Sequence, residues 1–526
     1  MAKAKALLVG CLVLVGIACT VALVALCIAA LADGSCSSGG FRHAAVSADS
    51  PTCSEIGRNM LQRGGSAVDG AIAALLCTSV VNPQSMGIGG GSIVTVRNKT
   101  GGVQVFNFRE TVPKSFKPNL LNDCPTKFTL STGAQWIGVP GELLGYEELH
   151  KQYGKLPWAK LFEPTIQLAR EGMPIEILCN KNKTILGKGD ILKFPKLAET
   201  METIAQKGTD AFYNGKIGQD LIQDIRAAGG TLKMEDLRSF RVRVQDMHIP
   251  PPPAGGALLA FILKIMKGFP LTPDSLAGDK KIQMYHRYIE AAKFANGQKK
   301  YVRDPGYNRE KSADHLLDPS FINRIREMIS SNRTFDNSYY DNVSPVSDHI
   351  GTTHVSVLDE DGLAVSATST INQLFGGAVY SPRTGIILNN ELADFCGRAD
   401  TLRAGEQPPS SMSPVILESK SGRILVIGGS GGSLITTSVA LSLINHLWLG
   451  MDLKDAIKAR IVFVDSQNNV NFEPGFDEGV ARGLGALGHS VGRWKYFLNV
   501  VNAVEKDNGC IRAVSDCRKM GGSAGY

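Results

Sequence analysis

The chain has 526 residues, of which 43% are hydrophobic and 20% are charged, so it is long enough and apolar enough to bury a large core. Its formal net charge of +7 is small for this length, and the charge forms no basic block. These values exclude a disordered chain and argue against a nucleic-acid partner.

An uncharged run opens the chain. Lys3 and Lys5 precede the run, which extends from residue 6 to residue 32 and exceeds the roughly 20 apolar residues that cross a hydrocarbon core. We therefore predict a cytoplasmic tail at 1–5 and a signal-anchor transmembrane helix at 6–32, as in a single-pass type II protein of the cell membrane whose remainder is extracellular. Cleavage near residues 30–32, which would release a secreted protein, is the alternative.

Eleven cysteines and four sequons bear on the same question. Three cysteines lie inside the uncharged run, and the other eight follow it, in a part of the chain where disulfides persist if it is exported. Cys53 and Cys77 flank two short helix patterns joined by glycines, so we predict a disulfide across a helical hairpin. The candidate glycosylation sites are Asn98, Asn182, Asn332 and Asn342.

The first ordered elements are predicted from their caps. A helix begins near Ser54 and ends at the glycines 64–65, and a second begins at Ser66, where Ser-x-x-Asp is similar to a capping box. A glycine cluster at 87–91 then precedes a predicted strand at 92–97. The cluster is more typical of a structural turn than of a ligand cradle, and it lacks the ending of a phosphate-binding loop.

The middle of the chain reads as mostly helical, with the clearest periodicity at 156–170 and 282–300. From Gly351 onward the pattern changes to short alternating strands. A strand starting at Thr352 is followed by an Asp-Gly turn signal at 361–362 and by a returning strand. This hairpin places Thr370 and Asn372 close to Thr352.

Thr352 is a candidate nucleophile. A threonine hydroxyl attacks only when a base removes its proton, and its own α-amine can do so once the preceding peptide bond is cut. Gly351-Thr352 is therefore a candidate self-cleavage site. His354 lies on the same strand face, where we interpret it as a strand-surface residue rather than as part of the site.

Several ordered motifs resemble the gamma-glutamyltransferases. They are the segment 82–91, Arg109-Glu110-Thr111, Gly351-Thr352, 366–372, Ser410-Ser411-Met412, Gly431-Gly432 and 515–526. The similarity covers nearly everything after residue 43. Within the family, the segments 133–142 and 380–385 are most similar to members that hydrolyse leukotrienes.

The resemblance implies an α+β fold, a four-layer αββα sandwich of the N-terminal-nucleophile hydrolase type. It implies a precursor that cuts itself into a heavy chain, 33–351, and a light chain, 352–526, which stay together as a heterodimer. The implied substrates are glutathione and its S-conjugates such as leukotriene C4, with water or an acceptor peptide taking the acyl group. No metal or other cofactor is implied.

The resemblance also assigns site residues one by one. Thr352 is the nucleophile, and the carboxylate-binding arginine is Arg109, whose planar fork suits bidentate contact. The implied ammonium ligands are Glu391 and Asp394, with Asn372 and Thr370 beside them. Further carboxylate donors are Ser410 and Ser411, and the oxyanion donors are Gly431 and Gly432.

Two other interpretations stay open at this stage. Residues 428–432 form a G-x-S-x-G pattern between a predicted strand and a predicted helix, which would make Ser430 the nucleophile of an α/β-type serine hydrolase with His489 downstream. The chain is also shorter than the family near 178–192, 247–250 and 396–407. An uncleaved, inactive surface glycoprotein is therefore the third interpretation.

Overall fold

The computed structural model describes residues 20, 36, 39–125, 130–175, 178–179, 185–186, 189–308, 312–342, 351–493 and 500–526. The predicted membrane helix at 6–32 falls almost wholly outside these residues. Within them, no helix is both long and apolar enough to span a membrane.

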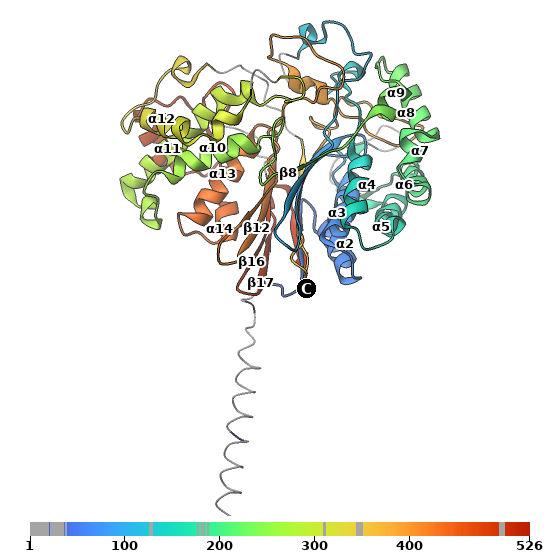
Figure 1. The fold of residues 1–526 in the computed structure, drawn as a ribbon, viewed down its shortest axis with the longest axis horizontal. Helices are drawn as coiled ribbons and strands as arrows, with labels where there is room; N and C mark the ends of the chain where they lie inside the picture. Colours follow the sequence, from blue (N-terminus) through green and yellow to red (C-terminus); the bar gives the residue numbers. More distant parts are fainter. Residues whose placement is uncertain are drawn as a thin grey trace, which may run out of the picture.

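Two antiparallel sheets form the centre of the molecule (Figure 1). The first has seven strands in the order β18-β1-β9-β10-β2-β3-β8, and the second has four in the order β11-β12-β16-β17. The first comprises β18 (Gly522–Gly525), β1 (Ala45–Ala48), β9 (Thr353–Leu358), β10 (Ala364–Thr370), β2 (Gly91–Arg97), β3 (Val103–Asn107) and β8 (Arg243–Asp246). The second comprises β11 (Val415–Glu418), β12 (Ile424–Ser430), β16 (Val500–Asp507) and β17 (Cys510–Val514).

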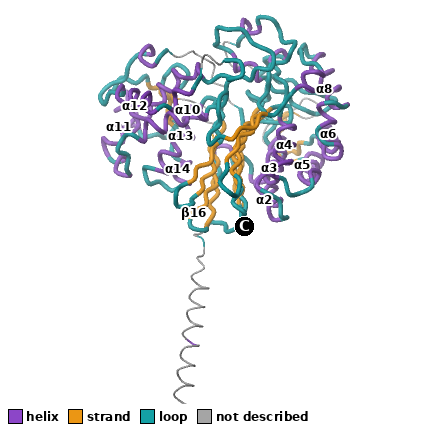
Figure 2. The backbone as a smooth tube through the Cα atoms, viewed as in Figure 1, coloured by secondary structure: helices purple, strands orange, loops and turns teal. Residues whose placement is uncertain are grey.

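Helices cover the outer face of each sheet, as Figure 2 shows in purple on either side of the orange strands. On the seven-stranded side lie α2 (Pro51–Gln62), α3 (Ala67–Val81), α4 (Glu142–Tyr153), α5 (Trp158–Glu171), α6 (Pro195–Lys207), α7 (Asp210–Tyr213), α8 (Lys216–Ala227) and α9 (Met234–Ser239). On the other side lie α10 (Gly256–Lys267), α11 (Gly278–Gln298), α12 (Pro319–Met328), α13 (Leu434–Leu447), α14 (Leu453–Lys458) and α15 (Glu478–Ala486). The αββα layering is confirmed.

In the described part of the chain, three smaller sheets accompany the two central ones. The largest joins β13 (Val462–Val464), β14 (Val470–Phe472) and β15 (Val491–Arg493). Two-stranded pairs join β4 (Met173–Ile175) to β7 (Asp190–Leu192), and β5 (Leu178–Cys179) to β6 (Ile185–Leu186).

The sheets pack face to face through β9. Strand β9 contacts α3 on one side and both β12 and β16 on the other. Every residue of β9 and β10 is buried, because these central strands are covered on both faces. Successive side chains of these strands therefore alternate between two buried faces, one packed against helices and one packed against the second sheet.

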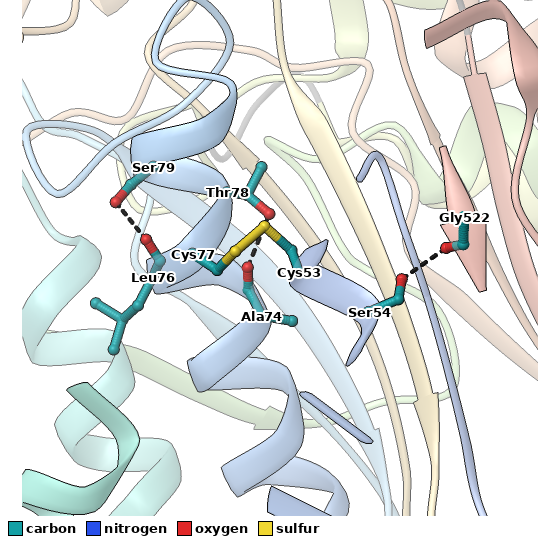
Figure 3. The surroundings of a disulfide bond; sticks show 8 residues. All are labelled: Cys53, Ser54, Ala74, Leu76, Cys77, Thr78, Ser79 and Gly522. Atoms are coloured by element: carbon teal, nitrogen blue, oxygen red, sulfur yellow. Dashed lines mark hydrogen bonds between the residues drawn. A yellow bond between two sulfur atoms is a disulfide. The ribbon is translucent and has the colours of Figure 1, made fainter. Parts of the chain in front are cut away.

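The helical hairpin near the start confirms the capping box of the second helix, whereas the first helix begins at Pro51, three residues before the predicted start at Ser54. Ser66 accepts a hydrogen bond from the backbone N–H of Asp69, and the Asp69 carboxylate accepts from the N–H of Ser66. The predicted disulfide Cys53–Cys77 joins the two helices (Figure 3). Beside it, the Ser54 hydroxyl donates to the Gly522 carbonyl at 2.6 Å, which ties α2 to the last strand of the chain.

Two disulfides that the sequence left unassigned connect distant parts of the chain. Cys36 is bonded to Cys510, 474 residues away, and Cys124 to Cys396, 272 residues away. Of the sequons, Asn98 is half-buried in the turn after β2, whereas Asn332 and Asn342 are exposed. Asn182 lies outside the described residues.

Candidate active site

The predicted hairpin brings Thr370 against Thr352. Ser369 pairs with Thr353 across β9 and β10, so the next residue along the returning strand reaches the nucleophile. The Thr352 hydroxyl donates to the Thr370 hydroxyl at 3.1 Å, and the Thr370 hydroxyl also accepts from the N–H of Asn372 at 2.8 Å. The prediction that these three residues lie together is confirmed.

The peptide bond before Thr352 is held on both sides. The N–H of Thr352 donates to the Ser85 carbonyl at 3.0 Å, and the carbonyl of Gly351 accepts from the N–H of Gly431 at 3.3 Å. Thr352 itself has a φ of +93°. This backbone region is costly for a β-branched residue and is typical of functional sites.

Glycines are needed where two chain segments approach closely. A Cβ at Gly351 would lie 2.0 Å from the Asn372 carbonyl oxygen, and one at Gly90 would lie 2.1 Å from the Thr370 carbonyl oxygen. The carbonyl of Gly90 also accepts from the N–H groups of Gly141 and Glu142. None of residues 87–91 lines the cleft at Thr352, so the cluster is a structural turn that packs against the strand carrying Thr370.

A buried charge cluster lies in the same cleft. Arg109 follows β3 and is fully buried, and its guanidinium nitrogens lie 2.7 Å from Glu391 and 2.6 Å from Asp394. Both acids are on the short helix η7 (Glu391–Phe395). Arg109 also donates to the carbonyls of Pro408 and Pro409, each at 2.8 Å. The three charged residues predicted to bind an amino-acid head group, Arg109, Glu391 and Asp394, therefore lie in direct contact with one another.

Burial changes the protonation of this cluster. Burial lowers the pKa of Arg109, but the attraction of Glu391 and Asp394 outweighs it, so the pKa is raised and the charge is kept. Burial raises the pKa of Glu391 above its ordinary range. It also raises the pKa of Glu110 well above its ordinary range, and among the described residues both side-chain oxygens of Glu110 lack a hydrogen-bond partner. Glu110 is therefore the acid that the structure favours as a neutral carboxylic acid.

The cleft has a volume of about 190 Å³. It contains nine of the ten residues predicted to catalyse or to bind substrate: Arg109, Thr352, Thr370, Asn372, Glu391, Asp394, Ser410, Ser411 and Gly432. Gly431, the tenth, lies beside it with its N–H on the Gly351 carbonyl. Gly431 and Gly432 have φ values of +112° and +60°, which the consecutive glycines allow.

Ser410 and Ser411 are half-buried at the end of the cleft that holds the proline carbonyls. The Ser410 hydroxyl accepts from the N–H of Met412 at 3.1 Å. That bond leaves the hydroxyl hydrogen available to a ligand, so Ser410 fits the predicted role as a carboxylate donor.

Sequence reasoning missed Lys519 as a site residue. Its ammonium group donates to the Thr352 carbonyl at 2.6 Å and to the Ser430 hydroxyl at 2.9 Å, and it lies 3.3 Å from the Asp49 carboxylate. Lys519 belongs to the 515–526 motif, so the signal was present as a family resemblance. Only the fold, which pairs the C-terminal strand β18 with β1 and β1 with β9, shows what the residue contacts.

The interpretation of His354 as a strand-surface residue is wrong. It is completely buried between the sheets and bonds to the hydroxyls of Thr368 at 2.8 Å and Ser356 at 2.9 Å. Burial lowers its pKa to about 3. The error arose because a polar strand face normally faces water, whereas here it faces a second sheet.

The serine-hydrolase alternative is not supported. The Ser430 hydroxyl accepts from Lys519, and β12 belongs to an antiparallel sheet rather than the parallel sheet that an α/β-hydrolase elbow requires. His489 instead bonds to His286 at 2.7 Å and accepts from Lys293 at 2.9 Å. These groups form a buried polar network with Glu290, to which Lys293 connects through Thr334.

Comparison with known proteins identifies the family. The model of the family described as gamma-glutamyltranspeptidase matches residues 53–526. The chain is 45% identical to the rat glutathione hydrolase 5 proenzyme, over 98% of each chain, and 44% identical to the human glutathione hydrolase 5 proenzyme, over 93% of this chain and 94% of that one. It is also 34% identical to scoloptoxin SSD14 of Scolopendra dehaani, over 92% of each chain.

Solved structures support the fold. The chain is similar to a cephalosporin acylase from Bacillus halodurans, with a TM-score of 0.82 and 22% identity over 94% of this chain and 97% of that one. It also resembles a gamma-glutamyltranspeptidase from Helicobacter pylori, with a TM-score of 0.50 and 23% identity over 57% of this chain and 95% of that one.

The alignment also bears on the segments that are short in this chain. The alignment with the rat relative spans 564 positions, whereas this chain has 526 residues, so at least 38 aligned positions have no residue in this chain (564 − 526). One predicted gap, near 247–250, follows β8, which is the partly exposed edge of the first sheet. A strand missing beyond that edge leaves backbone groups facing water rather than unpaired in the core.

The chain belongs to the gamma-glutamyltranspeptidase family and is a γ-glutamyl hydrolase and transferase.

Proposed function

We propose that this chain is a precursor that cuts itself between Gly351 and Thr352 and then hydrolyses the γ-glutamyl amide of glutathione and of glutathione S-conjugates such as leukotriene C4. The observation that carries the proposal is the geometry of the Gly351-Thr352 bond. Thr352 has a left-handed backbone conformation, and an N–H of the predicted oxyanion site already contacts the carbonyl that would be attacked.

The cut follows from ordinary acyl-transfer chemistry. The Thr352 hydroxyl oxygen attacks the Gly351 carbonyl carbon, and Gly431 donates to the oxygen that becomes negative. The C–N bond breaks, the nitrogen takes up the proton that the hydroxyl gives up and becomes the free amine, and an ester joins the two residues. Water then hydrolyses the ester, which frees the Gly351 carboxylate and leaves Thr352 with both its amine and its hydroxyl.

The processed site would use the same groups on substrate. The Thr352 hydroxyl attacks the γ-amide carbonyl while its own amine accepts the proton and passes it to the leaving amine. The N–H groups of Gly431 and Gly432 stabilise the oxyanion, a contribution typically of about 3 kcal/mol per donor. Water or an acceptor peptide then takes the γ-glutamyl group from Thr352.

The head group is recognised by opposite charges. A γ-glutamyl group carries an α-carboxylate and an α-ammonium on one carbon. Arg109 with Ser410 and Ser411 would bind the first, and Glu391 with Asp394 would bind the second. Both carboxyl groups lie within 2.7 Å of the Arg109 guanidinium, so a ligand ammonium placed beside them would contact two acidic side chains. Relatives named glutathione hydrolase 5 support glutathione as the substrate.

We further propose that residues 6–32 anchor the protein in the cell membrane with 33–526 outside, as heavy and light chains of a heterodimer. Three disulfides in the described residues support an exported protein. The exposed sequons Asn332 and Asn342 support the same location.

Expression of the full chain in mammalian cells tests the proposal. A denaturing gel with amino-terminal sequencing is expected to give a fragment starting at Thr352, and the processed protein is expected to release nitroaniline from γ-glutamyl-p-nitroanilide. Thr352→Ala should abolish both, whereas Thr352→Ser should retain part of each. Ser430→Ala serves as the matched control and should still be cut. An active, uncut wild-type chain would disprove the mechanism, and an uncut, inactive one would favour the inactive glycoprotein.

A further inference from the structure

The disulfide Cys124–Cys396 lies directly beside the predicted ammonium site. Cys396 is the residue after η7, the short helix that carries Glu391 and Asp394, and it lines the cleft. Cys124 follows another short helix, η1 (Leu120–Asp123). The bond therefore connects the substrate-reading helix to a segment that is 272 residues away in the sequence.

These two short helices belong to a core of their own. The buried residues of this small core are Val112, Leu120, Trp136, Leu392, Ala393, Phe395, Cys396 and Leu402. It is separate from the two large cores that hold the sheets and long helices together. A cluster of eight buried side chains stabilises a segment less than a large core does, and the disulfide adds a covalent restraint between the segments that carry the two short helices.

The segment has little regular structure to hold it otherwise. Residues 396–407 contain no helix or strand, and they include one of the regions that is short in this chain. Their contacts include backbone bonds between Val112 and residues 405–406, the pairing of Arg398 with Glu406, and side-chain bonds of Asp400 to Arg303 and of Gln407 to Asn107. Asp394 is 2.6 Å from Arg109 in this arrangement, and a small shift of η7 would separate them.

We propose that the Cys124–Cys396 disulfide is a positioning element of the γ-glutamyl site, and that its reduction by a small-molecule thiol weakens head-group binding. The proposal rests on the proposed function. Two molecules of the thiol are oxidised to one disulfide while the two cysteines become thiols. Cys124 is half-buried, and Cys396 is 9% exposed at the cleft, so Cys124 offers the entry point for the thiol.

The test compares two double variants. Cys124→Ser/Cys396→Ser removes the proposed element, and Cys36→Ser/Cys510→Ser removes another long-range bond, which does not line the cleft. With γ-glutamyl-p-nitroanilide, the first should raise KM at least fivefold with kcat changed less than twofold, because the nucleophile and oxyanion donors stay in place. The inhibition constant of free L-glutamate should rise in parallel. The control variant should keep both constants.

A titration of folded protein with dithiothreitol removes any dependence on refolding of the variants. The wild type and the Cys36/Cys510 variant should both show the rise in KM, and the Cys124/Cys396 variant should show no further rise. An active wild type whose KM does not respond, or a variant that loses kcat rather than affinity, would overturn the positioning role. A wild type without γ-glutamyl activity would overturn the proposed function, and with it this proposal.

Discussion

The side-chain ammonium of Lys519 donates a hydrogen bond to the main-chain carbonyl of Thr352 across 2.6 Å, although 167 residues separate them. The same ammonium donates to the Ser430 hydroxyl at 2.9 Å and to the Asp49 carboxylate at 3.3 Å. A fixed positive charge beside the nucleophile's own carbonyl orients that residue.

Replacement of this lysine should therefore slow both self-cleavage and turnover. A hydrogen bond to a charged group is worth about 1.5–3 kcal/mol, so Lys519→Met should reduce each rate by about 10- to 100-fold. Pulse-chase labelling measures the cut, and γ-glutamyl-p-nitroanilide measures turnover of the processed fraction. The exposed Lys420 gives the control Lys420→Met. Equal rates in both variants would show that Lys519 has no part in the site.

The glycine cluster offers a second test through two neighbouring residues. At Gly90 a Cβ would lie 2.1 Å from the Thr370 carbonyl oxygen, whereas at Gly87 it would meet nothing within 4 Å. Gly90→Ala should thus displace the strand that bears Thr370 and abolish processing, with a loss of stability of several kcal/mol. Gly87→Ala should be processed like the wild type. The pair is compared by gel and by thermal unfolding, and normal processing of Gly90→Ala would contradict the packing argument.

The contrast between these two glycines shows what the sequence can reveal. The motif predicted that the cluster is structural, and the hairpin turn at 361–362 predicted that Thr370 meets Thr352. Both follow from local rules of turn and register. Which glycine touches which carbonyl depends on the approach of β2 to β10, a contact between residues almost 280 positions apart. Local rules carry no information about that contact.

The burial of His354 and the two unassigned disulfides also depend on long-range contacts that the sequence alone did not predict. The sequence places His354 on one face of a strand, but only the packing of a second sheet against that face makes it a buried group. The Cys53–Cys77 pair was predictable because one helical hairpin contains it. Cys36–Cys510 and Cys124–Cys396 join segments that the fold alone brings together.

The buried His354 should make stability depend on acidic pH. Its pKa is lowered to about 3 in the folded chain and is about 6.5 when unfolded. The unfolded state therefore binds the extra proton first, so stability falls as the pH falls from 6.5 towards 3. At pH 5 the loss from this residue is about 2 kcal/mol relative to pH 7.

Unfolding of His354→Gln in urea checks this expectation. The variant should be less stable than the wild type at pH 7 because it loses hydrogen bonds to Thr368 and Ser356. The difference should shrink by about 2 kcal/mol at pH 5. The exposed His248 provides the control His248→Gln, for which no such change is expected. A constant difference between pH 7 and pH 5 would contradict the neutral, buried state of His354.

Self-cleavage should leave the heavy and light chains covalently joined. A cut before Thr352 puts Cys36 and Cys124 on one chain and Cys510 and Cys396 on the other, so both disulfides cross the cut. Processed protein should run as one band on a non-reducing gel and as two bands after reduction. Because either bond suffices, removing Cys36–Cys510 or Cys124–Cys396 alone should keep the single band.

Removing all four cysteines should give two bands without reductant. Separation of wild-type chains on the non-reducing gel would show that neither disulfide forms, whereas Cys53→Ser/Cys77→Ser, whose bond lies within one chain, should leave the pattern unchanged.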